Sequence, residues 1–336
     1  MARTSLADVA NEAGVHPSTA SRALNPETRA VVSRDTVARV LAAAQRLGYR
    51  PNHLARGLRT DKTFTVGIVV PDLENPLFPP LVRGAERSLG TEGYSLLVGN
   101  TDNDPEHTEA VIAALTDRRV DGLILATAEL NGAVEARIRA SGTPLVLVNR
   151  MSSDPSIPAI VGDDHAGIGL AVDHLVALGH TAIGHIAGPH RISTGRGRAA
   201  AFRDHLLRHG IEAEYIKSTE WFQVEPGETA TNALLDRHPA LTAIVAGNDL
   251  LALGAIRAAT VRNRLVPTDL SVTGYNDMPF VDMLQPPLTT VRVPYRQMGE
   301  MAAELLIKLL TQPDQPAASI QLTPTLTVRA STAAPG

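Results

Sequence analysis

The stretch AGVHPSTASRALN, residues 13–25, predicts a tight turn that leads into a short helix. Gly14 permits the turn, since glycine adopts backbone conformations that other residues avoid. Pro17 is acceptable at the first position of a helix, because its missing N–H would have no partner there and its φ is already near the helical value. We therefore expect a helix that begins at Pro17, with Ala20 and Leu24 facing inward and a polar face opposite.

Another helix is predicted immediately ahead of this turn. Its apolar residues recur at the i, i+3, i+4 and i+7 spacing of one helix face, and they are Leu6, Val9, Ala10 and Ala13. Ser5 and Asp8 form the Ser-x-x-Asp pattern of a capping box at its start. Two short helices joined by a glycine turn are typical of a helix-turn-helix unit.

A third amphipathic segment, residues 33–48, completes a small bundle. Ser33 is the expected N-cap and Gly48 the expected stop, and the positions expected to face inward are Val37, Val40, Leu41, Ala44 and Leu47. In a helix-turn-helix the second helix enters the major groove by its N-terminal end. We therefore expect base contacts from His16, Pro17, Ser18 and Arg22, with Arg22 suited to guanine O6 and N7.

Charge is distributed unevenly along the chain. The formal net charge is −4, but residues 1–60 hold nine arginines and four acidic residues, a net charge of +5, which leaves −9 for the rest. A basic segment on an acidic body is typical of a polyanion-binding module attached to a second domain. On charge alone, a solvated basic face is the alternative.

Composition limits the class of protein further. The 336 residues suit two or three domains, and 44% of them are hydrophobic, enough for sizeable cores. No apolar run approaches the ~20 residues of a membrane span, and the N-terminus lacks the apolar segment of a secretory signal. The absence of cysteine excludes disulfides, thiolate zinc sites and cysteine nucleophiles. We therefore expect a cytoplasmic protein without a membrane partner.

From residue 64 onward, short aliphatic runs alternate with helical stretches. This alternation predicts βαβ units and parallel sheets covered on both faces, and the length suits two such sheets. The runs are residues 64–70, 94–99, 122–127, 144–149, 182–188, 242–247 and 270–275. Since ligands of open α/β sheets bind at the carboxyl ends of the strands, we expect binding residues directly after these runs.

Motifs for catalysis or cofactors are weak or missing. GRGRAA, residues 195–200, fits G-x-G-x-x-A but lies several residues beyond the predicted strand, without the tight turn of a dinucleotide site. His180, His185 and His190 are spaced by five, which does not align them on one helix face. Neither a phosphate-binding loop nor a nucleophile elbow occurs. We expect no enzyme activity, no cofactor and no metal site.

Residues 49–63, YRPNHLARGLRTDKT, follow the predicted bundle. Pro51 ends what precedes it, and residues 52–58 would make only about two helical turns, fewer than the ~12 residues at which an isolated helix becomes marginal. Gly57 weakens such a helix further. We expect this segment to fold only against a partner, and a flexible tether is the alternative.

The sequence SLADVANEAGVHPSTASRALN, residues 5–25, followed by residues 50–63, resembles the LacI/GalR family of bacterial transcription regulators, and the similarity continues to about residue 330. The resemblance implies an N-terminal all-α helix-turn-helix domain, a hinge helix with its linker, and an α/β periplasmic-binding-protein-like domain for effector binding and dimerisation. These parts are residues 1–49, 50–63 and 64–330. The last part would form two Rossmann-like subdomains, 64–162 plus 292–322 and 163–291 plus 323–330.

The resemblance also implies how DNA is bound. In the family the hinge helix pairs with that of the dimer mate in the minor groove, and Leu58 is the matching leucine, with Arg56 and Arg59 near phosphates. The residues expected at the DNA are Ser5, His16, Pro17, Ser18, Ser21, Arg22, Asn25, Ala55, Arg56, Leu58 and Arg59.

The polar residues after the predicted strands resemble the effector pocket of that family, in the cleft between the two subdomains. Those expected to bind the effector are Phe78, Asn149, Arg150, Thr194, Arg198, Trp221, Phe222, Asn248, Asn276 and Asp277. Many relatives have aspartate where Asn149 and Asn276 stand. Fewer anionic acceptors would therefore face the ligand in this chain.

Amide groups and an arginine fork suit a neutral, hydroxyl-rich molecule, and an aromatic ring packs on its apolar face. We therefore expect a dimeric repressor that binds a pseudo-palindromic operator in double-stranded DNA and is controlled by a small sugar. A nucleoside or purine, or an acidic ligand held by Arg150 and Arg198, is an alternative effector. A sugar-binding protein without a DNA role is the alternative function.

Overall fold

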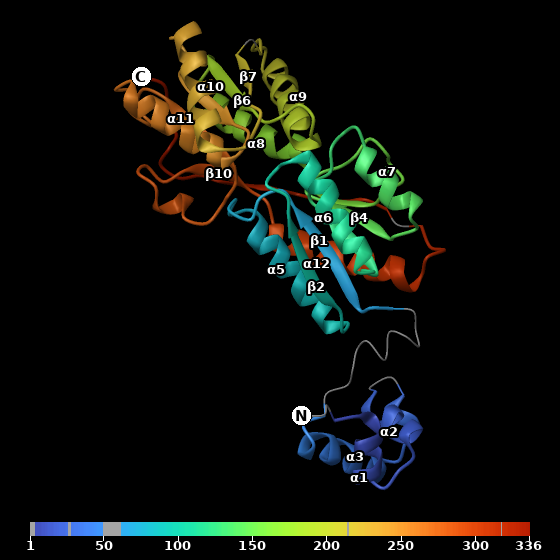
Figure 1. Ribbon diagram of the computed structural model, residues 1–336. Helices are drawn as coiled ribbons and strands as arrows, with labels where there is room; N and C mark the ends of the chain where they lie inside the picture. The colour runs from blue at the N-terminus through green and yellow to red at the C-terminus, as the bar shows by residue number, and fades with distance from the viewer. Residues whose placement is uncertain (1–3, 26–27, 50–61, 214, 317) are drawn as a thin grey trace. The chain divides into compact units, whose positions relative to one another are not determined.

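The computed structural model describes residues 4–25, 28–49, 62–213, 215–316 and 318–336. The chain forms two compact units, residues 1–63 and 64–336 (Figure 1). Each unit has its own hydrophobic core.

The N-terminal unit is a bundle of short helices. Its elements are α1 (Leu6–Glu12), α2 (Pro17–Leu24), the 3-10 turn η1 (Arg29–Val31) and α3 (Arg34–Arg46). The predicted capping box of Ser5 and Asp8 is confirmed, and Pro17 is the first residue of α2 as predicted. Gly14 and Gly48 both have positive φ, which fits the predicted turn and the predicted helix stop.

The core of this unit corrects one predicted position. Val9, Ala20 and Val40 are completely buried, together with Ala10, Ala23 and Ala43. Leu41 is 39% exposed, so its predicted inward orientation is wrong. The buried stripe of α3 follows residues 40, 43 and 44 at helical spacing, and this turns Leu41 to the flank of the helix. Leu24 is only half-buried but packs against the core.

The larger unit alternates strands and helices. Its strands are β1 (Thr65–Val70), β2 (Ser95–Asn100), β3 (Gly122–Leu125), β4 (Leu145–Val148), β5 (Ala159–Gly162), β6 (Ile183–Ala187), β7 (Ile216–Ser218), β8 (Ala243–Ala246), β9 (Ser271–Asn276), β10 (Thr289–Arg292), β11 (Ile320–Leu322) and β12 (Thr325–Thr327). Its helices are α5 (Phe78–Thr91), α6 (Pro105–Asp117), α7 (Ala133–Ala140), α8 (Asp164–Ala177), α9 (Ser193–Arg208), α10 (Val224–Arg237), α11 (Asp249–Val261), α12 (Tyr295–Thr311) and the 3-10 turn η2 (Val281–Met283).

The strands form two six-stranded sheets. The first sheet has the order β11-β5-β4-β3-β1-β2, and the second has the order β12-β10-β9-β8-β6-β7. All pairs are parallel except β10 with β12. The two parallel sheets are therefore confirmed, and each of the seven predicted runs overlaps a strand. The other five strands, β5, β7 and β10 to β12, are each three or four residues long.

The chain passes between the two sheets three times. It leaves the first sheet after β5, returns through α12 to β11, and passes to β12 in the second sheet. Arg292 ends β10 and so belongs to the second sheet, one residue beyond the expected boundary. We name the part built on the first sheet the first half and the part built on the second sheet the second half.

Helices α5 and α12 cross closely on the first half (Figure 1). A Cβ added at Gly84 would collide with the backbone carbonyl of Arg296, and one at Gly299 would collide with that of Leu81. These glycines therefore let the two backbones approach each other. In both halves, the loops at the carboxyl ends of the strands supply most of the polar residues described next.

Candidate functional site

The N-terminal end of α2 carries the predicted base-reading face. His16 is the N-cap, and its Nδ1 accepts a hydrogen bond from the Ser18 backbone N–H at 3.3 Å and lies 2.8 Å from the Ser18 hydroxyl. His16, Pro17, Ser18 and Arg22 are all exposed. The start of the helix is thus fixed by its own side chains while its outer face stays open.

Three other predicted DNA residues of this unit lie at helix ends or on a flank. The Ser5 hydroxyl donates to Asp8 Oδ2 at 2.8 Å and accepts from the Asp8 backbone N–H, so it completes the capping box while remaining exposed. Ser21 is half-buried, and its carbonyl accepts from the backbone N–H of Asn25, the C-cap of α2. The predicted hinge contacts Ala55, Arg56, Leu58 and Arg59 lie outside the described residues.

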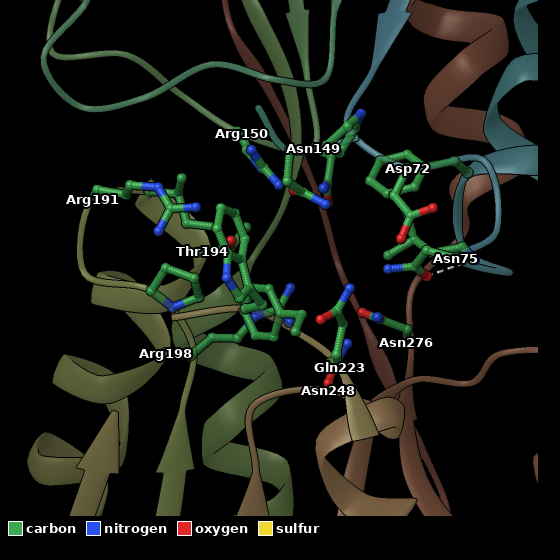
Figure 2. A pocket seen from close by; sticks show the side chains of 18 residues that line it. Asp72, Asn75, Asn149, Arg150, Arg191, Thr194, Arg198, Gln223, Asn248 and Asn276 are labelled. Carbon is green, nitrogen blue, oxygen red and sulfur yellow. Dashed lines mark hydrogen bonds between the residues drawn. The ribbon is translucent and has the colours of Figure 1, made fainter. Parts of the chain in front are cut away.

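A pocket lies between the two halves of residues 64–336 (Figure 2). It encloses about 580 Å3 between side chains, part of it open to solvent. Nine of the ten predicted effector residues line it: Phe78, Asn149, Arg150, Thr194, Arg198, Trp221, Phe222, Asn248 and Asn276. They follow strands of both sheets, as the strand-end rule predicts. We call this cavity, which holds the residues expected to bind an effector, the effector pocket.

Arg198 is the most firmly held of these side chains. Its Nε donates to Asp164 Oδ1 at 2.8 Å, its Nη1 donates to the Gly247 carbonyl at 2.6 Å, and its guanidinium lies 3.7 Å from the centre of the Tyr275 ring. Burial alone would lower the pKa of Arg198, but the adjacent Asp164 carboxylate, together with Tyr275 and Tyr295, raises it overall. Arg198 is therefore permanently protonated, and its guanidinium is held in one position at the effector pocket.

Arg150 differs because its charge has no ion-pair partner among the described residues. The side chain is 9% exposed, and its Nε has no hydrogen-bond partner in the described part of the chain. Burial, with Arg191 and Arg198 nearby, lowers its pKa to about 10. It stays protonated at neutral pH and faces the effector pocket (Figure 2).

Three of the pocket asparagines, Asn149, Asn248 and Asn276, are positioned by backbone geometry or by their own side-chain carbonyl oxygens. Asn248 Oδ1 accepts from the Leu251 N–H at 2.8 Å as the N-cap of α11, and Asn276 Oδ1 accepts from the Tyr295 hydroxyl at 2.6 Å. Asn149 and Asn276 have positive φ, a conformation that asparagine tolerates better than most residues. Since the side-chain oxygens of Asn248 and Asn276 are engaged, these two asparagines present amide N–H donors to a ligand.

Aromatic rings form part of the pocket wall. The Arg191 guanidinium lies 4.2 Å from the centre of the Trp221 ring, and this orients the indole. Phe222 packs against Gly188, where a Cβ would overlap its ring. Phe78 is the first residue of α5 and is 3% exposed. Two rings from the second half and one from the first therefore bound the polar groups.

Asp277 is not among the residues that line the effector pocket. Its carboxylate accepts from Arg292 Nε at 2.6 Å and from Arg329 Nη2 at 2.7 Å. It comes directly after Asn276, the last residue of β9, but these two arginines hold it on the side of β10 and the C-terminal segment. Strand-end position alone could not separate the two neighbours.

Several pocket residues were not predicted individually. They are Asp72, Asn75, Asn103, Arg191 and Gln223. Asp72 and Asn75 follow β1, Asn103 follows β2, and Arg191 follows β6, so the strand-end rule contained the signal for four of them. Gln223 directly precedes α10, and only its position next to Trp221 and Phe222 pointed to it.

By their own geometry, the described residues meet neither the requirements of a metal site nor those of a membrane-spanning helix. Within them, no group of three or more histidine, aspartate or glutamate side chains is placed to hold a metal ion. The described helices also include none that is both long and apolar enough to span a bilayer.

Comparison with known proteins identifies the family. Residues 5–52 match the family described as "Bacterial regulatory proteins, lacI family", and residues 172–332 match "Periplasmic binding protein-like domain". The chain is 38% identical to the HTH-type transcriptional regulator MalR of Streptomyces coelicolor, over 99% of this chain and 98% of the relative. The chain belongs to the lacI family. Its N-terminal bundle is thus a DNA-binding helix-turn-helix domain, and the protein is a transcription regulator.

Other members of the lacI family are similar to this chain over nearly its full length. The ribose operon repressor of Escherichia coli K12 is 35% identical over 96% of this chain and 98% of its own length. A crystal structure of the Lac repressor dimer bound to operator and the anti-inducer ONPF has a TM-score of 0.86 and 29% identity, covering 99% of this chain and 100% of that one. The predicted fold class, a helix-turn-helix domain with a two-sheet periplasmic-binding-protein-like domain, is confirmed.

Proposed function

We propose that this transcription regulator is a cytoplasmic repressor without catalytic activity, which binds a pseudo-palindromic operator as a homodimer and is controlled by a small sugar in the effector pocket. One observation carries the effector assignment: amide donors, two buried guanidiniums and aromatic rings meet in one pocket, from both halves. Such groups donate to and stack against a neutral polyol. The names of the ribose operon repressor and the operator-bound Lac repressor dimer support the repressor, dimer and sugar assignments.

Two details of DNA binding belong to the same proposal. The base-reading residues are His16, Pro17, Ser18 and Arg22, supported by their exposure at the start of α2. Residues 50–63 act as a hinge that orders on DNA, with Leu58 inserted into the minor groove, and this rests on the sequence resemblance alone. Replacing Leu58 by alanine should weaken operator binding more than binding to unrelated duplex.

The test starts by selecting the operator from a pool of randomised duplexes with the full chain. Operator affinity is then measured by fluorescence anisotropy while sugars, nucleosides and sugar acids are added. A sugar should change the affinity by about tenfold or more, the usual size of an allosteric coupling. If only nucleosides or sugar acids change it, the sugar assignment is wrong.

A matched pair of variants locates the response. Thr194→Val removes one pocket hydroxyl while keeping the shape of a buried side chain, and Thr260→Val makes the same change on the exposed surface of α11. The effector concentration for half-maximal response should rise in the first variant and stay unchanged in the second. An equal effect of both variants would remove Thr194 from the site.

A further inference from the structure

His16 and Ser18 are joined by two contacts at the start of α2. The Ser18 backbone N–H donates to His16 Nδ1 at 3.3 Å, and the Ser18 hydroxyl oxygen lies 2.8 Å from the same nitrogen. A backbone N–H can only donate, so Nδ1 carries no proton in this arrangement. The hydrogen between Nδ1 and the Ser18 oxygen is therefore the one that the hydroxyl donates.

The backbone at the start of α2 explains why the imidazole is held in this way. Pro17 is the first residue of the helix and has no N–H. The N–H groups of Thr19 and Ala20 donate to the His16 carbonyl, at 2.9 and 3.1 Å. The Ser18 N–H has no such backbone acceptor at the helix start, and the imidazole supplies one, as N-cap side chains do.

These proton positions decide what each side chain offers to DNA. An imidazole without a proton on Nδ1 is neutral and carries its single proton on Nε2. Since His16 is exposed, it offers this N–H to the outside as a donor. The Ser18 hydroxyl has its only hydrogen directed to Nδ1, so its exposed oxygen offers lone pairs and acts as an acceptor.

The fixed polarity restricts what Ser18 can recognise. A serine hydroxyl that is free to rotate both donates and accepts, so it suits any base. An oxygen that only accepts is limited to the amino groups in the major groove, which are cytosine N4 and adenine N6. The Nε2–H of His16 needs the opposite kind of partner, such as N7 or O6 of guanine, N7 of adenine or O4 of thymine.

We propose that the hydrogen bond from Ser18 to His16 makes Ser18 a specific acceptor for the amino group of cytosine or adenine, while His16 donates from Nε2 to a purine nitrogen or a base carbonyl. This inference rests on the proposed base-reading face of α2 and adds which base atoms it reads. His16 is then a positioning residue for Ser18 as well as a base contact.

The experiment starts from the operator that the full chain selects from randomised duplexes. The base pair whose preference relaxes in Ser18→Ala is the pair that Ser18 reads. Two synthetic changes are made separately in this pair. One deletes the amino group, by pyrimidin-2-one in place of cytosine or purine in place of adenine, and the other replaces N7 of the purine by carbon. Fluorescence anisotropy measures the affinity of each duplex.

Deleting the amino group should weaken binding of the parent by about threefold to tenfold more than binding of Ser18→Ala, the value of one hydrogen bond. Comparing the two proteins on the same duplex cancels any effect on base pairing itself. The change at N7 should affect the parent and Ser18→Ala equally. If instead the N7 change is coupled to Ser18 and the amino deletion is not, Ser18 donates and the inference is overturned.

Two variants of His16 test the positioning role. His16→Ala removes the acceptor and frees the Ser18 hydroxyl, so the dependence on the amino group should fall. His16→Asn should retain it, because asparagine is a preferred N-cap whose oxygen accepts from the same groups. Ser33→Ala is the matched control: Ser33 is the exposed N-cap of α3, with its hydroxyl 2.9 Å from Thr36 Oγ1, and its loss should leave the dependence unchanged.

Nitrogen NMR of the histidine side chains gives a readout without DNA. At about pH 8, where an ordinary histidine is neutral, His16 should carry its proton on Nε2, and its signals are assigned by their absence in His16→Asn. A proton on Nδ1 would overturn the inference. So would a dependence on the amino group that stays unchanged in His16→Ala, and either result leaves the proposed repressor standing. If Ser18→Ala relaxes no base preference, both the inference and the place of Ser18 in the base-reading face are wrong.

Discussion

Arg191 and Glu129 join the two halves of residues 64–336 across the mouth of the effector pocket. Arg191 Nε donates to Glu129 Oε1 at 3.0 Å, and the Arg191 carbonyl accepts from the Leu130 N–H at 2.9 Å. Nearby, the Met151 N–H donates to Ser193 Oγ at 2.9 Å, again from one half to the other. Since Arg191 also lies over Trp221, the contact that holds the halves together also positions a pocket ring.

Removing these contacts should weaken effector binding. Glu129→Gln and Ser193→Ala each remove one link that exists only when the halves are together, so less of the binding-competent conformation is populated. Both side chains of the ion pair are about a third exposed, which limits the loss to about 1 kcal/mol or about fivefold in affinity. The quenching of Trp221, the single tryptophan of the chain, gives the affinity.

The control for this prediction is Glu228→Gln. Glu228 pairs with Arg257 at 3.1 Å between α10 and α11, entirely within the second half. Its loss should leave effector affinity unchanged. If Glu129→Gln and Glu228→Gln act alike, the cross-pocket contacts do not control closure.

Arg198 should be required for folding as well as for effector binding. Arg198→Gln leaves the Asp164 carboxylate in a mostly buried site without its cation, and breaking such a pair costs on the order of 3 kcal/mol. Adding Asp164→Asn should recover much of this loss. Urea unfolding followed by Trp221 fluorescence measures both variants, and an equal cost of Arg198→Gln with and without Asp164→Asn would show that the pair is not coupled.

Local sequence patterns predict much of the N-terminal bundle and of the effector pocket. The capping box of Ser5 and the helix start at Pro17 are visible because each rule concerns residues that are neighbours in sequence. The strand-end rule finds Asn149 and Arg198, since parallel strands bring their carboxyl ends to one edge. These features need no knowledge of long-range packing.

The features that the sequence did not predict depend on contacts between residues that are far apart in the chain. Asp277 and Asn276 are adjacent, yet Arg292 and Arg329 hold Asp277 outside the pocket. Leu41 fits an amphipathic pattern as well as its neighbours do, and only the packing of three helices decides which flank is buried.

Acid should destabilise the larger unit through His185. This histidine is completely buried in β6, where Nδ1 donates to the Val245 carbonyl at 2.7 Å, and burial lowers its pKa to about 4. An unfolded histidine titrates near 6.5, so between about pH 6.5 and 4 only the unfolded state gains the proton. The free energy of unfolding should fall with decreasing pH by up to about 1.4 kcal/mol per unit, and His185→Gln should make this slope shallower.

Asp249 should change the pH dependence of the free energy of unfolding in the opposite direction. It is completely buried, accepts from Thr290 Oγ1 and from the Met278 N–H, and burial raises its pKa to about 7. Between about pH 4 and 7 the folded state keeps a proton that the unfolded state loses, so this contribution falls as pH rises. Asp249→Asn should therefore make stability increase more steeply with pH. A change of the slope in the same direction in His185→Gln and Asp249→Asn would contradict one of the two assignments.

Arg22 should read one base of the operator. It is exposed on α2, one turn after Ser18, and a guanidinium there can donate two hydrogen bonds to guanine O6 and N7. Arg22→Ala should cost about 1–3 kcal/mol of binding free energy for the selected operator and relax base choice at one position of each half-site.

Arg39→Ala, on the exposed face of α3, is the matched control and should leave base preference intact, because it removes a positive charge away from the base-reading end of α2. Selection from randomised duplexes with each variant measures the preference. An unchanged preference in Arg22→Ala would show that α2 meets the DNA through other side chains.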